Sequence, residues 1–230
     1  MIAKSSIRAV PLMALVLGAS TAGRAAAEEA SGCRAEVWAE AIAAFAKQDE
    51  KEAPPTEGIL FVGSSSIRMW DLKKSFPDLP AINRGFGGSQ ICDAVHYAEE
   101  LVVKHRPEVV VFYSGDNDIA AGKSPEQVQR DFREFVDKVR KPLPDARIVF
   151  VSIKPSVARW KLADKIREAN RLIREDVGED KQVVFLDVWE EMLGEDGMPR
   201  KELLRDDGLH LNEAGYKVWT KLVRPHLDDK

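Results

Sequence analysis

Short apolar runs alternate with amphipathic stretches along most of the chain. Between the runs, apolar positions recur every three or four residues, which predicts helices that are buried by one face. The runs themselves have the length of strands and are almost continuously apolar, as is typical of parallel strands covered on both sides: residues 59–62, 81–83, 109–113, 148–153 and 183–186. Strands that alternate with helices predict a three-layer α/β/α sandwich with a mainly parallel five-stranded sheet.

The helical stretches carry recognisable start and stop signals. Apolar residues at helical spacing over residues 91–102 predict a helix that ends before Pro107. Ser124 is expected to cap a second helix, which begins at the following proline. Asn212 is expected to cap the last helix. Two further helices are predicted, over residues 34–47 and 157–177. The stretch 48–57 is charged and contains prolines, so it is interpreted as a loop.

The N-terminal residues have the layout of a secretory signal peptide. Lys4 and Arg8 precede an apolar run over residues 9–19, and small residues follow up to Ala27. The run is shorter than the roughly 20 apolar residues of a membrane span. We therefore expect residues 1–27 to be a signal peptide, and the protein to be exported to a periplasm or secreted.

The remaining chain is expected to contain an N-terminal helix and loop over residues 28–57 and one folded domain over residues 58–230. An uncleaved N-terminal anchor and a lipoprotein attached at Cys33 are the alternatives. In an exported protein Cys33 and Cys92 can form a disulfide, although Cys92 at a helix start suits a buried free thiol equally well.

The charge balance limits the kinds of partner that the protein can have. The chain has 34 Lys and Arg against 38 Asp and Glu, a net charge of −4. Loss of Lys4, Arg8 and Arg24 with the signal peptide would leave 31 − 38 = −7. Such a chain lacks the broad positive field that attracts nucleic acids or anionic lipid. We therefore expect no nucleic-acid partner and no stable membrane insertion after cleavage.

Unusual residues follow several of the predicted strands. Because ligands bind beyond the carboxyl ends of parallel strands, these segments are expected to meet at one edge of the sheet. Each alone could be a turn or a helix cap. Together they supply the groups of an acyl-transfer site, and they are residues 63–66, 84–89, 114–118 and 207–210.

Each group of such a site has a candidate. A serine hydroxyl needs a base, and His210 can take its proton and later return it to the leaving alcohol. Asp207, three residues earlier, can accept a hydrogen bond from the other ring nitrogen. The oxyanion of the intermediate would be bound by the amide of the nucleophilic serine, the amide of Gly88 and the side-chain amide of Asn117. A metal hydrolase built on Asp116, Asp118, Asp207 and His210 would leave the serine and the asparagine without a role.

These segments resemble the sequence blocks of the SGNH hydrolase superfamily, the GDSL-type esterases and lipases. The similar stretches are residues 59–66, 83–89, 115–118 and 207–212, in the order of the family. The resemblance implies a flavodoxin-like fold and assigns the following roles: Ser65 as nucleophile, Asp207 and His210 as its triad partners, and Gly88 and Asn117 as oxyanion donors beside the Ser65 amide.

Two positions depart from the family pattern. Ser64 stands where the family usually has Asp, and Ser89 stands where an acidic residue usually follows the glycine of the second block. We expect these two changes to alter the local hydrogen bonding of the family pattern. Ser64 and Ser66 remain alternative nucleophiles. The second block also resembles the platelet-activating-factor acetylhydrolase-like branch, which suggests a short acyl group.

The sequence is thus interpreted as a serine esterase that cleaves carboxylic esters of small molecules without a metal or other cofactor. A polar and aromatic rim of Arg68, Lys154, Arg159 and Trp160 is interpreted as the candidate substrate contact, with Arg68, Lys154 and Trp160 foremost. The alternatives are a non-catalytic exported module that binds a glycan or lipid and, among enzymes, a lysophospholipase, thioesterase or carbohydrate deacetylase.

Overall fold

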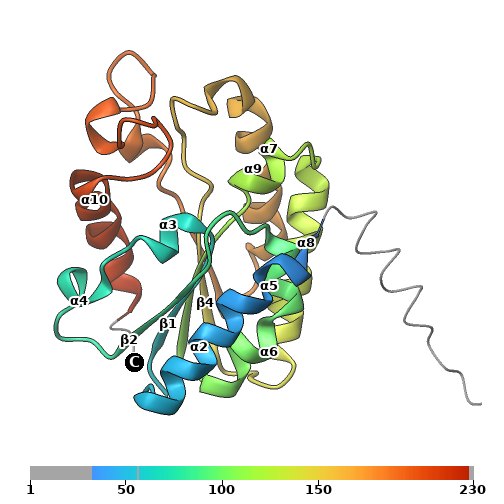
Figure 1. The fold of residues 1–230 in the computed structure, drawn as a ribbon. Coiled ribbons are helices and arrows are strands. Elements are labelled where there is room, and N and C mark those ends of the chain that lie inside the picture. The colour runs from blue at the N-terminus through green and yellow to red at the C-terminus, as the bar shows by residue number, and fades with distance from the viewer. Residues whose placement is uncertain (1–32, 56, 228–230) are drawn as a thin grey trace, which may run out of the picture.

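A five-stranded parallel sheet forms the centre of the molecule. The computed structural model describes residues 33–55 and 57–227. The strand order is β2-β1-β3-β4-β5, and every neighbouring pair is parallel. The predicted three-layer α/β/α fold is therefore confirmed (Figure 1). The strands are β1 (Ile59–Gly63), β2 (Ala81–Gly85), β3 (Val109–Tyr113), β4 (Arg147–Val151) and β5 (Val183–Leu186).

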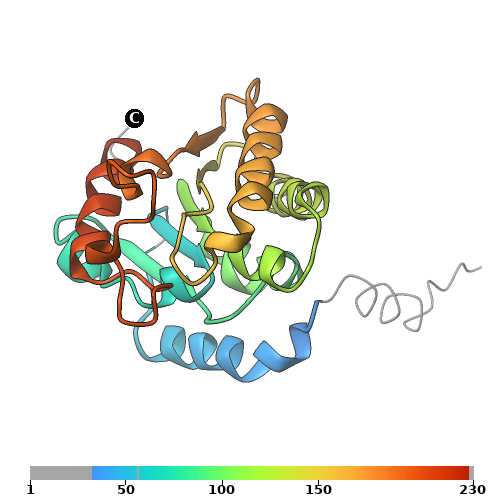
Figure 2. The ribbon, with the colours of Figure 1, turned by 90° about the horizontal axis from the view of Figure 1, so that it is seen from above.

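Helices cover both faces of this sheet (Figures 1 and 2). Successive strand residues point to opposite faces, so Leu60 and Val62 pack on one side while Phe61 packs on the other. The first face carries α2 (Ala39–Lys51), α5 (Ile91–His96), α6 (Ala98–Leu101), α8 (Pro125–Arg140) and α9 (Ala163–Val177). The second carries α3 (Ser65–Arg68), α4 (Leu72–Ser75) and α10 (Glu213–Val223).

Several short helices complete the fold. Of these, α7 (Asp116–Ala120) follows β3 directly and contributes to the site described below. The others are 3₁₀ turns: η1 (Ala35–Trp38), η2 (Val103–His105), η3 (Trp160–Leu162), η4 (Glu190–Met192), η5 (Lys201–Leu203) and η6 (Arg224–His226).

The strand order reverses between β1 and β3, which makes the ends of these two strands the expected place for a ligand. From β1 the chain crosses to β2 on one side, and it then returns to β3 on the other side of β1. At such a point the segments that follow the two strands diverge, which opens a binding site. Gly63 ends β1 with φ +140°, and a Cβ there would lie 1.9 Å from the Tyr113 carbonyl oxygen. Only glycine therefore allows β1 to pass so close to the end of β3.

Several predicted boundaries differ in the structure. The helix expected over residues 91–102 breaks at Tyr97 into α5 and α6. The strand expected over residues 148–153 ends at Val151, because the Asn170 side chain takes the place of a strand partner for Ile153. Its Oδ1 accepts from the Ile153 amide at 2.8 Å, and its Nδ2 donates to the Ile153 carbonyl at 2.9 Å.

The other differences concern helix ends. The helix expected over residues 157–177 starts at Ala163, after the turn η3. Near the N-terminus, helix α2 continues to Lys51, beyond the predicted start of the loop. Ser124 and Asn212 cap α8 and α10 as expected, accepting from the amides of Gln127 and Gly215.

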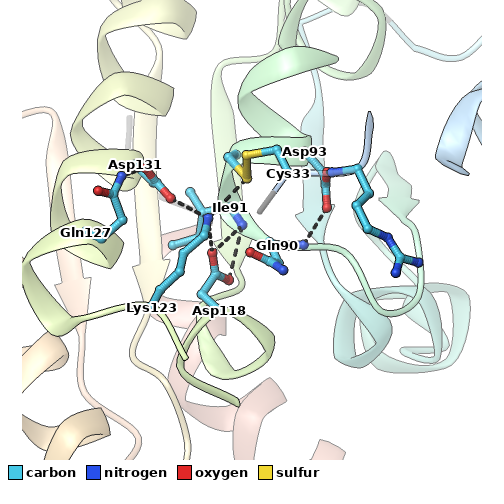
Figure 3. The surroundings of a disulfide bond; sticks show 10 residues. Cys33, Gln90, Ile91, Asp93, Asp118, Lys123, Gln127 and Asp131 are labelled. Atoms are coloured by element: carbon cyan, nitrogen blue, oxygen red, sulfur yellow. Dashed lines mark hydrogen bonds and ion pairs between the residues drawn. A yellow bond between two sulfur atoms is a disulfide. The ribbon is translucent and has the colours of Figure 1, made fainter. Parts of the chain in front are cut away.

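A disulfide joins Cys33 to Cys92 at the start of α5, with their Cα atoms 5.9 Å apart (Figure 3). Two hydrogen bonds accompany it: the Arg34 amide donates to Asp93 Oδ1 at 3.0 Å, and the Tyr97 hydroxyl donates to the Ala35 carbonyl at 2.8 Å. Of the two states left open for the cysteines, the structure thus has the disulfide. The predicted signal peptide lies outside the described residues. Among those residues, no helix has the length and apolar character needed to cross a bilayer.

Candidate active site

The structure brings Ser65, His210 and Asp207 into one chain of hydrogen bonds. Ser65 is the first residue of α3, and the other two lie on the loop before α10. His210 Nε2 lies 3.0 Å from Ser65 Oγ, and its Nδ1 lies 2.6 Å from Asp207 Oδ2. This arrangement lets the imidazole take the serine proton while the carboxylate holds the ring.

The loop that carries His210 and Asp207 is tightly turned. Asp207 Oδ1 accepts from the amides of Leu209 and His210, both at 2.9 Å, and Gly208 has φ +61°. The Arg205 amide donates to the His210 carbonyl at 2.8 Å. Hydrogen bonds from the His210 ring and backbone hold the pKa of Asp207 well below its usual range. The carboxylate, whose side chain is 46% exposed to water, therefore stays charged.

The neighbouring serines have different surroundings. Ser64 and Ser66 are buried, whereas Ser65 is partly exposed. The Ser64 amide donates to the Tyr113 carbonyl, and its hydroxyl has no hydrogen-bond partner among the residues that the structure describes. Of the three hydroxyls, that of Ser65 faces the histidine.

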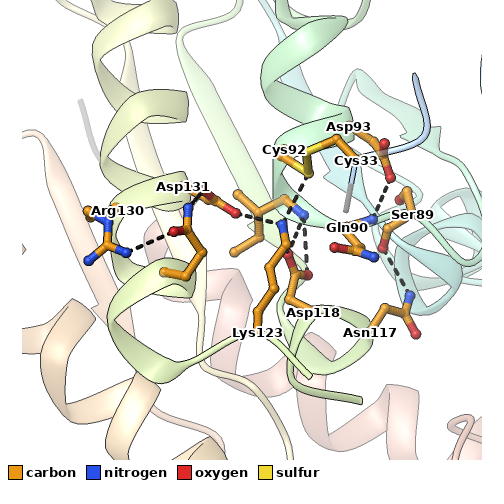
Figure 4. A network of polar contacts seen from close by, with 12 residues as sticks. Cys33, Ser89, Gln90, Cys92, Asp93, Asn117, Asp118, Lys123, Arg130 and Asp131 are labelled. Carbon is orange, nitrogen blue, oxygen red and sulfur yellow. Dashed lines mark hydrogen bonds and ion pairs between the residues drawn. A yellow bond between two sulfur atoms is a disulfide. The ribbon is translucent and has the colours of Figure 1, made fainter. Parts of the chain in front are cut away.

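The three predicted oxyanion donors lie on segments that contact one another. As the first residue of α3, Ser65 leaves its amide without an intrahelical acceptor. Gly88 is exposed and has φ +87°, a backbone conformation that favours glycine. Asn117 Nδ2 donates to the Ser89 carbonyl at 2.9 Å, which joins the third block to the second (Figure 4). Ser89 Oγ donates to the Phe86 carbonyl at 2.8 Å and thus supports its own turn.

Next to this contact, a buried ion pair and a hydrogen bond link Asp118 of the third block to the residues just after the second block (Figures 3 and 4). Both oxygens of Asp118 accept from the Ile91 amide at the start of α5, at 3.1 and 3.2 Å. Lys123 Nζ lies 3.2 Å from Asp118 and 2.7 Å from Asp131. Burial raises the pKa of Asp118 to about 6. This network fixes the start of α5, just after the second block, relative to α7.

The candidate substrate rim is only partly at the surface. Arg68 is exposed, three residues after Ser65, and lies against Gly87 of the second block. Trp160 is half-buried and stacks on Trp189 with the ring centroids 6.2 Å apart. Lys154, in contrast, is 1% exposed, so the structure does not place it on an exposed rim. Its ammonium group lies 3.8 Å from Asp116, which explains how the charge is buried.

One contact of the site was not predicted from the sequence. Arg159 lies in the loop after β4, and its guanidinium donates to Asn117 Oδ1 at 2.8 Å. It also lies 2.9 Å from Asp116 Oδ2. The sequence showed only a basic residue after a strand, which suggested a surface rim and not a partner of Asn117.

The carboxylates once considered as metal ligands are paired with cations and amides. Asp116 contacts Lys154 and Arg159, whereas Asp118 contacts Ile91 and Lys123. Within the described residues, no three His, Cys, Asp or Glu side chains are grouped closely enough to bind a metal ion.

Comparison with known proteins places the chain in a family. The sequence pattern of the GDSL-like Lipase/Acylhydrolase family matches residues 64–218. No curated protein sequence matches significantly. A solved Streptococcus pneumonia protein, provisionally described as a platelet activating factor, is 22% identical with a TM-score of 0.74, over 90% of this chain and 100% of that one.

Two further solved structures share the fold. A GDSL-like lipase from Bacteroides thetaiotaomicron is 19% identical with a TM-score of 0.69, over 81% of this chain and 97% of its own. Axe2, an acetylxylan esterase from Geobacillus stearothermophilus, is 15% identical with a TM-score of 0.59, over 76% of this chain and 96% of its own. Because the family pattern spans more than half of the sequence, the chain belongs to the GDSL-like lipase/acylhydrolase family of ester hydrolases, as its sequence blocks suggested.

Proposed function

We propose that the protein is a serine esterase in which Ser65, His210 and Asp207 form the catalytic triad. The observation that carries the proposal is the continuous contact from Ser65 Oγ through the His210 ring to Asp207, at 3.0 and 2.6 Å. A nucleophile, a base and an orienting carboxylate in this geometry are suited to acyl transfer.

The proposed reaction has two halves. His210 takes the proton of Ser65 as Oγ attacks the ester carbonyl, and the oxyanion that forms is bound by the amides of Ser65 and Gly88 and by Asn117 Nδ2. His210 then gives the proton to the leaving alcohol, which leaves an acyl group on Ser65. Water, activated by the same histidine, releases the acid and restores the serine.

We propose short acyl groups, acetate foremost, as the acids released. The support is indirect: the second block resembles a branch of acetylhydrolases, and one similar fold belongs to an acetylxylan esterase. The alcohol part of the substrate is best found by a screen of acetylated sugars, lysophospholipids, acyl thioesters and aryl esters.

The test is hydrolysis of p-nitrophenyl esters from acetate to octanoate by the purified protein. Ser65→Ala is expected to lower kcat by at least about 10³-fold. Ser64→Ala is the matched control, because its buried hydroxyl does not face His210; it should stay within about twofold of wild type. Turnover that survives in Ser65→Ala would refute the assigned nucleophile. An inactive wild type across all acyl lengths would favour a non-catalytic binding module.

We also propose that the protein is exported after cleavage behind Ala27. The charged and apolar order of the first residues supports this, as does the Cys33–Cys92 disulfide, since disulfides persist mainly in oxidising compartments. Fractionation of the producing cells and N-terminal sequencing should find a mature chain that begins at Glu28. An intact Met1 in the cytoplasm would contradict the proposal.

A further inference from the structure

Arg159 bridges two consecutive residues of α7. Its Nη2 donates to Asn117 Oδ1 at 2.8 Å, and its Nη1 lies 2.9 Å from Asp116 Oδ2. The side chains of Arg159 and Asp116 are 17% and 7% exposed, so the ion pair is largely shielded from water. In such surroundings a charged hydrogen bond holds its acceptor more firmly than it would at the surface.

This contact determines which way the Asn117 amide faces. Its oxygen is turned to a guanidinium, which can only donate, and its nitrogen to the Ser89 carbonyl, which can only accept. A flipped amide would set two donors against each other at Arg159 and two acceptors against each other at Ser89. In the observed orientation, one N–H of Asn117 Nδ2 donates to the Ser89 carbonyl. The second N–H is left to donate to an oxyanion.

Arg159 is itself held from several sides. Its own carbonyl accepts from the Leu162 amide at 2.8 Å, and the adjacent Ala158 amide donates to the Gly208 carbonyl at 3.0 Å. The loop of Arg159 is thereby attached to the loop of His210 and Asp207. Lys154 approaches Asp116 from the buried side, at 3.8 Å. Two basic side chains thus contact the one carboxylate that precedes Asn117.

We propose that Arg159 is a positioning residue of the oxyanion hole, which fixes the Asn117 amide so that its N–H meets the negative oxygen of the intermediate. The inference rests on the proposed esterase function and deepens it. Arg159 touches neither Ser65 nor His210 in the structure's hydrogen bonds within the described residues, so its effect passes through Asn117.

A double-mutant cycle on p-nitrophenyl acetate tests this role. This ester is small and neutral, so loss of a distant substrate contact should not affect it. Asn117→Ala is expected to lower kcat about 10²-fold or more, as for the loss of one oxyanion donor. Arg159→Met should lower kcat about 10-fold, with KM within about twofold. In the Asn117→Ala background the same substitution should change kcat less than about twofold, because no amide is left to position.

Two further variants separate geometry from charge and from folding. Arg159→Lys keeps the positive charge but lacks the two guanidinium nitrogens that contact Asn117 and Asp116 together. We therefore expect kcat to remain impaired in this variant. Arg171→Met removes an exposed arginine of α9 and should leave kcat unchanged. Should Arg159→Met fail to fold, Arg159→Gln takes its place in the cycle, with thermal unfolding measured alongside.

The possible results are distinguishable. Additive losses in the cycle, an effect on KM alone, or full activity of Arg159→Lys would overturn the positioning role. An inactive wild type, or an Asn117→Ala variant as active as wild type, would instead refute the proposed function on which the inference rests.

Discussion

At the scale of a single residue, Asp207 uses its two carboxylate oxygens for different partners. Oδ1 accepts from the amides of Leu209 and His210 and shapes the loop, while Oδ2 contacts the His210 ring. The structural and the proposed catalytic contribution of this residue are therefore carried by separate atoms. A substitution that changes only one of the oxygens can measure them independently.

We expect Asp207→Asn to lower kcat by about 10³-fold or more without a change in thermal stability. An asparagine oxygen can still accept from the two amides, but its NH₂ group would face Nδ1 of His210 and favour the wrong tautomer. Ester hydrolysis and thermal unfolding, measured on the same preparation, provide the check. Asp207→Ala, which also loses the loop contacts, is the comparison. Unchanged activity in Asp207→Asn would show that the carboxylate has no part in turnover.

At the scale of elements, the strands could be predicted because each is a local apolar run. The meeting of their carboxyl ends follows from parallel topology, so Ser65, Asn117 and His210 could be expected at one edge from their sequence positions. The contacts around them could not be predicted. Lys154 is buried because Asp116 lies beside it, and β4 ends where it does because Asn170 reaches back to Ile153. Neither partner leaves a signal in the sequence near the residue it affects.

Asn170 accordingly offers a prediction for the loop after β4. Asn170→Ala would leave both the amide and the carbonyl of Ile153 without their buried partner. We expect the free energy of unfolding to fall by about 2–4 kcal/mol, as for two unsatisfied backbone groups. Urea denaturation measures the change. Equal stability of Asn170→Ala and wild type would contradict the assigned contact.

At the scale of the whole molecule, the N-terminal helix is attached to the sheet domain at both ends. The disulfide holds its start, and a cluster around Asp49 holds its end. Asp49 pairs with Arg84 of β2 and with Lys104, and buried His105 completes the cluster, with Nε2 accepting from Arg84 Nε at 3.4 Å. His105 could not be singled out from its sequence position, because Asp49 and Arg84 lie on other elements.

This cluster predicts how stability depends on pH. Burial, and next the charge of Arg84, lower the pKa of His105 to about 4 from its usual 6.5. The unfolded chain therefore takes up a proton before the folded protein does, so stability falls as the pH drops from about 6.5 to 4. The titration of His105 accounts for at most about 3 kcal/mol of this loss in the free energy of unfolding.

Urea denaturation at pH 7 and pH 4.5, at constant ionic strength, measures this effect. His105→Gln cannot titrate and should lose less stability between the two pH values than wild type. His96→Gln, a substitution outside the cluster, should behave as wild type does. An identical loss in wild type and His105→Gln would refute the assignment.

The disulfide also has a consequence for covalent connectivity. It closes a ring over residues 33–92, with a sequence separation of 59, that contains Ser65 and Gly88 but neither Asn117 nor His210. A single peptide-bond cut between α2 and β1, within residues 52–58, would open this ring without releasing a fragment. Such a nicked molecule would run as one band in a non-reducing gel and as two after reduction. The disulfide would thus keep the N-terminal segment with α2 joined to the domain that carries the site, even where the backbone beside α2 is broken.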